Sequence, residues 1–174
     1  MVLSLDDSRW NTLTTAYNMP ASSVAKLLAT AYRAGMNDEL LGDIINDVQH
    51  QGDTSEAMYA TAPHLLALAQ SCDTEIAIQL IAHAGIICAA SQSKRAVPCP
   101  VDLELDFEAT KRLGKQLSLV HLACDHPFEI FKYLLTALTA FSGYGRFAEI
   151  IDGFDFYQNR FHHALLDNPL EDEP

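Results

Sequence analysis

Apolar residues recur at spacings of three and four along most of the chain, and polar residues occupy the positions between them. This is the period of an α-helix with one buried face, whereas a half-buried strand alternates every second residue. No such alternation is sustained, so the sequence predicts an all-α protein of about eight helices. We expect them to begin near Asp7, Pro20, Asn37, Asp53, Asp73, Leu105 and Phe128, with a short helix over residues 146–151 and a last one over residues 154–166.

Residues that cap helices stand directly before several of these segments. Asn37 and Asp73 each precede an apolar helical stripe, and their side chains accept a hydrogen bond from the first turn. Residues 53–56 read Asp-Thr-Ser-Glu, the spacing of a capping box, with an aspartate in the Ser/Thr position. The sequence therefore predicts that the fourth helix starts at Asp53, directly after a turn at Gly52.

Some residues predict how the helices pack. Pro63 lacks the N–H that an interior helical residue donates, so we expect the fourth helix to kink or restart there. Gly85 lies in the most apolar helix and would let a neighbouring helix approach closely. In the two longest later segments we expect the inward faces to be Ala109, Leu113, Leu117, Val120 and Cys124, followed by Phe128, Phe131, Leu135 and Leu138.

Three helix ends look like versions of one element. Residues 26–31, 64–69 and 133–138 share a Leu-Leu pair followed by Ala or Thr. The first two lie 38 residues apart, which is close to the period of helical-pair repeats, although the second interval is longer. We therefore predict an irregular HEAT/armadillo-like helical-hairpin stack. Its single domain covers residues 1–166, and residues 167–174 form an acidic C-terminal tail.

Two parts of the chain resemble a known group of proteins. The first part is marked by Trp10, Ala16-Tyr17, Val24 and Leu27-Leu28. The second is marked by Gln51-Gly52-Asp53, Tyr59-Ala60, Ala62-Pro63-His64-Leu65 and Leu68-Ala69. In this pattern the first 70 residues or so resemble uncharacterised bacterial HEAT-like proteins. Asn18-Met19 departs from it, since a glycine usually follows the tyrosine. The resemblance implies a short helical-repeat fold, and some of these proteins are thought to act as immunity or interaction proteins.

The charge distribution narrows the choice of partner. Eleven Lys and Arg stand against 23 Asp and Glu, a formal net charge of −12. No Lys or Arg occurs from Ala34 to Ser93, where the acids are Asp38, Glu39, Asp43, Asp47, Asp53, Glu56, Asp73 and Glu75. Nucleic-acid binding requires the opposite sign, so we expect no nucleic-acid partner. A basic protein partner is favoured, because an acidic field speeds its encounter.

The sequence thus predicts a non-catalytic protein–protein interaction module with an acidic surface. Its most concrete form is a bacterial immunity protein that binds and neutralises a basic toxin. We expect the partner to contact the end of the third helix and the turn after it, through Asp43, Asp47, His50, Gln51, Asp53 and Glu56. The alternative is a small-ligand-binding protein or an enzyme with a histidine-containing groove between helices, using His50, His64 or His121.

No known catalytic or metal-binding pattern stands out. His121 and His126 are split by a helix end, and His162 and His163 are adjacent, so neither pair has the spacing of helical zinc ligands. The cluster Cys124-Asp125-His126 is the best-looking nucleophile site, but sequence adjacency does not build the hydrogen bond from base to nucleophile. We therefore expect no metal, no cofactor and no catalysis.

Location is predicted from what the chain lacks. The first residues contain no basic region followed by an apolar run, and the four cysteines form no CxxC pair. The uncharged stretch 76–93 contains Gln79 and His83 and is expected to be a buried helix rather than a membrane span. We expect a cytoplasmic protein with free thiols and no membrane partner.

Overall fold

The computed structural model describes residues 2–50 and 53–153. Within them the chain is mostly helical, at 69%, with seven α-helices packed against each other. The helices are α1 (Ser22–Ala34), α2 (Asp38–Val48), α3 (Ala57–Ala69), α4 (Thr74–Ser91), α5 (Glu104–Leu122), α6 (Phe128–Phe141) and α7 (Gly145–Asp152). Two 3₁₀ turns, η1 (Ser8–Asn11) and η2 (Val101–Leu103), and two short strands, β1 (Gln49–His50) and β2 (Asp53–Thr54), complete the order. The all-α prediction is confirmed.

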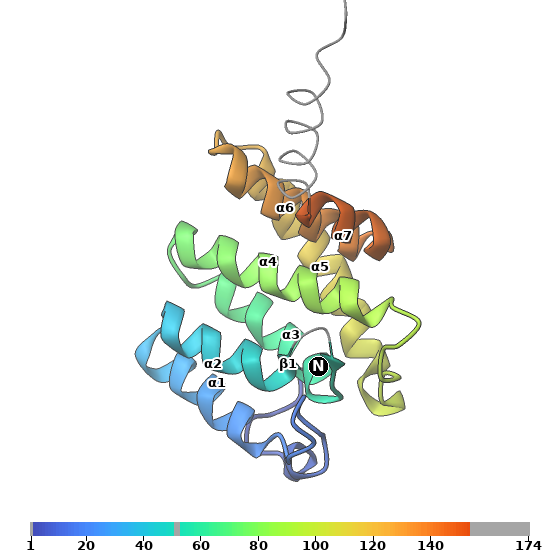
Figure 1. Cartoon of the computed structure of the whole chain (residues 1–174). Coiled ribbons are helices and arrows are strands. Elements are labelled where there is room, and N and C mark those ends of the chain that lie inside the picture. The colour runs from blue at the N-terminus through green and yellow to red at the C-terminus, as the bar shows by residue number, and fades with distance from the viewer. Residues whose placement is uncertain (1, 51–52, 154–174) are drawn as a thin grey trace, which may run out of the picture.

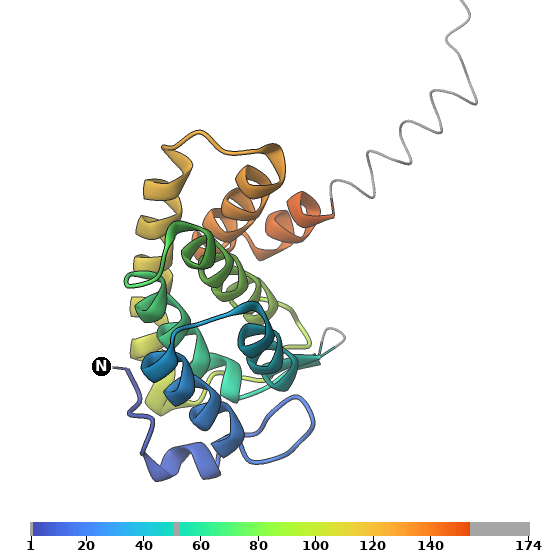
Figure 2. The same ribbon diagram turned by 90° about the vertical axis from the view of Figure 1, so that its left-hand side faces the viewer.

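The helices form successive layers (Figure 1). The antiparallel pair α1–α2 lies at one end, α3–α4 in the middle, and α6–α7 at the other end. Figure 2 shows the stack from the side, with α5 running along the edge of the layers, and α5 contacts both α3 and α6. Stacked helical pairs are common to many all-α folds, so the layers by themselves do not establish a HEAT or armadillo repeat.

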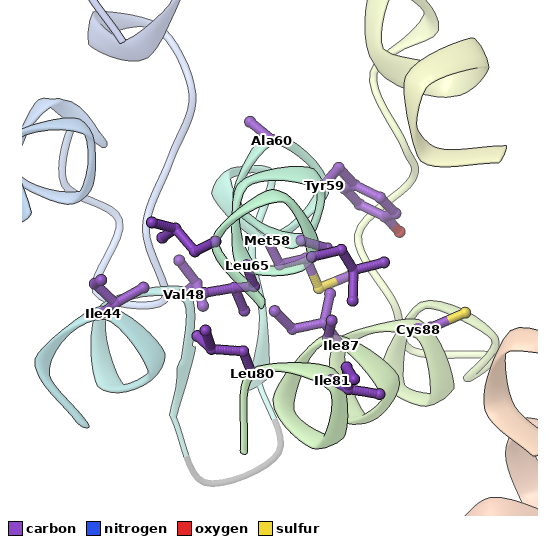
Figure 3. Packing of buried hydrophobic residues seen from close by; sticks show 14 of the residues in the cluster. Ile44, Val48, Met58, Tyr59, Ala60, Leu65, Leu80, Ile81, Ile87 and Cys88 are labelled. Atoms are coloured by element: carbon purple, nitrogen blue, oxygen red, sulfur yellow. The ribbon is translucent and has the colours of Figure 1, made fainter. Parts of the chain in front are cut away.

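The core is centred on α3 and α4. Every residue of α3 except Ala67 is buried, because α1, α2, α4 and α5 all pack around it. Figure 3 shows Ile44 and Val48 of α2, Met58 and Leu65 of α3, and Leu80, Ile81 and Ile87 of α4 in one cluster. A helix that is apolar on all sides has to be central, and α3 and α4 both satisfy that expectation.

The predicted caps of the third and fifth helical segments are confirmed. The Asn37 side chain accepts a hydrogen bond from Leu40 N at 2.8 Å, and the Asp73 side chain accepts one from Ile76 N at 3.1 Å. Asp7 caps the first turn in the same way, but that turn is the 3₁₀ helix η1 rather than an α-helix. Each cap satisfies an N–H group that the helix itself leaves unpaired.

The predicted start of the fourth helix is wrong. Asp53 and Thr54 form β2, which pairs antiparallel with β1, and α3 begins only at Ala57. Ser55 explains the delay, because its buried hydroxyl donates to Val48 O at 2.7 Å and ties the hairpin to the end of α2. The helix also continues through Pro63 without the predicted restart.

The close approach expected at Gly85 is confirmed. A Cβ atom added there would lie 2.6 Å from both Cα and Cβ of Ala137 on α6. Real side chains do not approach that closely, so α4 and α6 depend on glycine at this crossing. Gly114 of α5 plays the same part, since its missing side chain leaves room for the ring of Phe141.

The predicted inward faces of α5 and α6 are right in part: Leu113 and Leu117 of α5 pack against the core, and Leu135 and Leu138 of α6 are half-buried, whereas the other predicted residues are exposed. Val120 is 64% exposed, Ala109 and Cys124 are exposed, and α5 instead buries Phe107, Thr110, Gly114 and Ser118. On α6, Phe128 and Phe131 are exposed, while Leu134, Ala137, Ala140 and Phe141 are buried. The buried faces combine large side chains such as Phe107 and Phe141 with small residues such as Gly114 and Ala137, and the small residues let these helices approach closely.

The predicted last helix over residues 154–166 and the acidic tail over residues 167–174 lie outside the described residues.

Candidate functional site

The exposed face of α2 is strongly acidic. Asp38 and Glu39 occupy the first turn, where the helix dipole favours negative charge. Asp43 and Asp47 lie four residues apart, so they share one side of the helix. Within the described part of the chain, no Lys or Arg forms an ion pair with any of these four carboxylates. Among the described residues, their charge is therefore not neutralised by a basic side chain.

Asp47 is held in place from the neighbouring loop. Ser23 Oγ donates to its carboxylate at 3.0 Å, and Ala16 N donates to its backbone oxygen at 2.7 Å. These contacts fix the loop before α1 against the side of α2. Asp43, one turn earlier, is exposed and has no hydrogen bond to another described side chain.

Tyr17, Asn46 and His50 form a polar cluster beside these acids. Tyr17 Oη lies 3.0 Å from both Asn46 Oδ1 and His50 Nδ1, and His50 Nδ1 lies 3.0 Å from Asn46 Oδ1. With a proton on Nδ1, the Asn46 oxygen accepts from both the tyrosine and the histidine. The Tyr17 and His50 rings are 5.0 Å apart, which also packs them against each other.

We call this surface the acidic edge. It consists of Asp38, Glu39, Asp43, Asp47 and the cluster Tyr17, Asn46 and His50. The prediction omitted Tyr17 and Asn46 as contact residues. Tyr17 reaches α2 across 29 and 33 residues of sequence, and no local pattern shows so distant a contact.

Three of the predicted contact residues, Gln51, Asp53 and Glu56, do not belong to the acidic edge. Glu56 is partly buried, and its Oε2 accepts from Thr14 N at 3.3 Å and from Thr14 Oγ1 at 3.4 Å. It therefore holds the N-terminal loop against the start of α3. Asp53 pairs with His50 in the hairpin, and Gln51 lies outside the described residues.

His64, one of the three histidines of the alternative hypothesis, is part of the core. Its Nε2 donates to Leu3 O at 3.0 Å, and its Nδ1 accepts from Tyr32 Oη at 3.2 Å. Burial lowers its pKa to about 4, only partly opposed by the bond to Leu3. The ring is therefore neutral at pH 7, and both of its nitrogens already have partners.

The three histidines of the alternative hypothesis do not come together. His50 belongs to the acidic edge, and His64 to the core between α1 and α3. His121 lies at the end of α5, where its backbone oxygen accepts from His126 Nε2 at 2.8 Å.

A different groove contains histidines that the prediction assigned elsewhere. It lies between α4, α6 and the end of α7, has a volume of about 810 Å³, and includes His83 and His126. Burial lowers the pKa of His83, which keeps its ring neutral. In the sequence, Gln79 and His83 are the polar i,i+4 pair in the most apolar helix, which was a usable signal for this groove.

The cysteines are free thiols in the described chain and show no sign of activation. Burial raises the pKa of Cys88 and of Cys99 to about 11, so both remain protonated at neutral pH. The Cys124 thiol donates to Val120 O at 4.0 Å, and His126 bonds to the His121 carbonyl rather than to this sulfur. The Cys124-Asp125-His126 cluster thus lacks the bond between base and nucleophile.

Two further findings concern metals and membranes. No group of three or more His, Cys, Asp or Glu side chains that could hold a metal ion occurs among residues 2–50 and 53–153. In the same ranges, α4 alone is long and apolar enough to cross a membrane, and 56% of it is buried inside the protein. A core helix of a soluble protein passes the same test.

A scan against protein-family models finds no match to this chain, and searches of curated proteins and of solved structures find no significant relative.

Proposed function

We propose that this protein is a non-catalytic interaction module that binds a basic protein through the acidic edge. The observation that carries the proposal is the set of four carboxylates on α2 that no base neutralises within the described chain. A surface of one sign attracts partners of the opposite sign and raises their rate of association.

The acidic edge also offers apolar contact area. Tyr17 is 46% exposed and Met19 is 61% exposed, and both lie in the loop next to Asp47. Thr15 Oγ1 accepts from the backbone N–H of both residues, which holds the loop in shape. Exposed tyrosine and methionine among charges are typical of interfaces, where a few such residues supply most of the binding energy.

The most concrete version is a bacterial immunity protein that neutralises a basic toxin in the cytoplasm. The acidic edge supports it, as does the resemblance of the first 70 residues to bacterial HEAT-like proteins. A toxin has to be bound tightly before it acts, and electrostatic steering serves that need. The natural candidate partner is the product of a toxin-like reading frame beside this gene.

The test compares two variants of equal charge. Asp43→Lys/Asp47→Lys reverses the acidic edge, whereas Glu104→Lys/Glu129→Lys changes the net charge equally at exposed positions on α5 and α6. Affinity for the candidate toxin is measured by calorimetry at low and high salt. We expect the edge variant to lose at least about tenfold in affinity and most of its salt dependence, and the control to lose little.

Equal affinity of the edge variant and the wild type would contradict the proposal. Loss of affinity in both variants to the same extent would show that net charge, rather than the acidic edge, attracts the partner. Tyr17→Ala gives an independent check, since it removes apolar contact area without changing the charge.

A further inference from the structure

The groove that contains His83 and His126 lies between two layers of the stack, with α4 on one side and α6 on the other (Figure 1). The two helices come into their closest contact where Gly85 meets Ala137. The groove is lined mainly by residues that precede this crossing on both helices, so α4 and α6 separate toward their N-terminal halves. The space left between them has a volume of about 810 Å³.

The body of the groove is apolar. Ile78, Ala82 and Ile86 form the α4 side, and Ile130 and Tyr133 form the α6 side. The Tyr133 ring is 43% exposed, so part of this wall is in contact with water. Sites for organic molecules have volumes of roughly 300–1,000 Å³ and are mostly apolar, with a few polar groups that fix the orientation of the ligand. This groove has the size and lining of such a site.

Two polar side chains are set into the apolar wall, one turn apart on α4. Gln79 and His83 are half-buried, and neither side chain makes a hydrogen bond to another residue in the described part of the chain. Polar groups that lose contact with water usually have such partners. Burial lowers the pKa of His83, so its neutral ring offers one donor and one acceptor. A polar group within an otherwise apolar ligand could bond to either residue.

The charged groups that line the groove are acidic. Glu75 lies in the first turn of α4, and Asp152 is the last residue of α7. Among the described residues that line the groove, none is Lys or Arg. Lys132 lies close by, with its Nζ 5.2 Å from the centre of the Tyr133 ring, but it does not line the groove. Two carboxylates without a lining base repel an anionic ligand and attract a cationic one.

Asp152 is better placed than Glu75 to hold a cation. It also lines a smaller cavity with Gln49, Ile86 and Ala90, which places it at the end of the groove nearest the crossing of α4 and α6. The last carbonyls of α7 carry partial negative charge there and add to its attraction for a cation. Glu75 lies at the positive end of α4, which partly offsets its charge.

We propose that this groove binds a small amphipathic amine, with its apolar body between α4 and α6 and its ammonium group against Asp152. The walls around Ala82 and Tyr133 would cover the body, and covering apolar surface is favourable. The ammonium would donate a charge-assisted hydrogen bond to the carboxylate. Gln49 beside Asp152 precedes His50 in sequence, but no residue that defines the acidic edge lines the groove. The two proposals can therefore fail independently.

The test uses two fluorescent probes of opposite charge on the full chain. Dansylcadaverine has an aromatic body on an alkyl chain that ends in an ammonium group, whereas dansyl-aminocaproate ends a chain of the same length in a carboxylate. Dansyl emission becomes stronger and shifts to shorter wavelength when the ring leaves water, so a titration gives the affinity. We expect saturable binding of the amine, and binding of the acid that is at least about tenfold weaker.

A matched pair of variants tests the position of the ammonium group. Asp152→Asn removes a charge at the groove, and Glu129→Gln removes one at an exposed position of α6 that does not line it. We expect Asp152→Asn to weaken binding of the amine at least about fivefold without weakening that of the acid. Glu129→Gln should leave the affinity for both probes nearly unchanged.

A second pair tests the apolar wall. Tyr133→Ser removes a ring that lines the groove, whereas Tyr144→Ser removes one at an exposed position outside it. We expect Tyr133→Ser to weaken binding of the amine at least about threefold, because the dansyl group loses apolar contact, and Tyr144→Ser to have little effect.

Four results would overturn the proposal. No saturable binding of the amine up to about 1 mM would show that the groove takes no such ligand. Equal affinity for the two probes would show that it does not select a cation. Equal losses in Asp152→Asn and Glu129→Gln would assign the attraction to net charge, and equal effects of Tyr133→Ser and Tyr144→Ser would place the probe elsewhere.

Discussion

The two ends of the stack are held together in different ways. At the N-terminal end, buried polar side chains make directional hydrogen bonds: Trp10 Nε1 donates to Ser4 O at 2.9 Å, and His64 joins Leu3 to Tyr32. At the C-terminal end, helices meet chiefly where side chains are missing, as at Gly85 against Ala137 and Gly114 against Phe141, and one side chain, Gln92, adds hydrogen bonds to Ala140 O and from Gly145 N, both at 2.8 Å. Each hydrogen bond fixes the distance and angle between two groups, whereas close packing depends on the shape of the whole contact surface of both helices.

This difference has a consequence for exposed apolar area. Close contact through small residues leaves the larger side chains of α5, α6 and α7 outside, including Val120, Phe128, Phe131 and Phe147. The N-terminal end exposes fewer such residues, and its helix α2 carries the carboxylates of the acidic edge. The two ends therefore differ in their surfaces: an acidic edge at one, and more exposed large apolar side chains at the other.

Substituting Gly85 should have the largest effect, because it breaks the packing of the C-terminal end directly. In Gly85→Val the new side chain would collide with the backbone of Ala137, and we expect a loss of at least ~3 kcal/mol in the free energy of unfolding. Urea denaturation measures it. Gly42→Ala is the control, since nothing lies within 4 Å of a Cβ at that helical position. There we expect a gain of about 0.5–1 kcal/mol, and a similar loss in both variants would refute the close-packing account.

The buried His64 should give the N-terminal end a dependence on pH. Its pKa is about 4 in the folded protein against 6.5 for an unperturbed histidine, so the unfolded chain binds the extra proton between these values. Stability is then fully present above pH 6.5 and is lost as the pH falls toward 4, by about 2–3 kcal/mol. Between pH 4 and 7, the free energy of unfolding measured by denaturation should rise less steeply with pH in His64→Gln than in the wild type. An unchanged slope would assign the effect to other groups, such as His83, whose pKa burial also lowers.

The smallest effect is expected at the surface ion pair that joins η1 to η2. Arg9 Nε and a second guanidinium nitrogen donate to the two oxygens of Asp102, at 2.7 and 3.1 Å, across 93 residues of sequence. Asp102 is largely exposed, so solvent screens the pair and we expect a coupling below about 1 kcal/mol. A double-mutant cycle with Arg9→Ala and Asp102→Ala, repeated at high salt, measures it. A coupling that does not weaken with salt would argue against a solvent-screened pair.

Much of the candidate site was visible in the sequence, but its organisation was not. The stretch without Lys or Arg identified Asp43, Asp47 and His50, which all lie on the acidic edge. Glu56 shared the same pattern yet bonds to Thr14, and Tyr17 joined the edge from a distant loop. Composition gives the charge of a region, whereas the neighbours of each side chain depend on contacts between remote segments.

What the sequence alone determined is local. Helical periods and the caps at Asn37 and Asp73 follow from residues within one or two turns of each other, so they could be predicted. Only the tertiary structure decided where α3 begins, which face of α5 turns inward and where a groove opens. In α5 two helical faces competed, and the one with Gly114 and Ser118 was buried because α6 approaches it closely. That choice depends on the combined shape of two helices, which no single segment encodes.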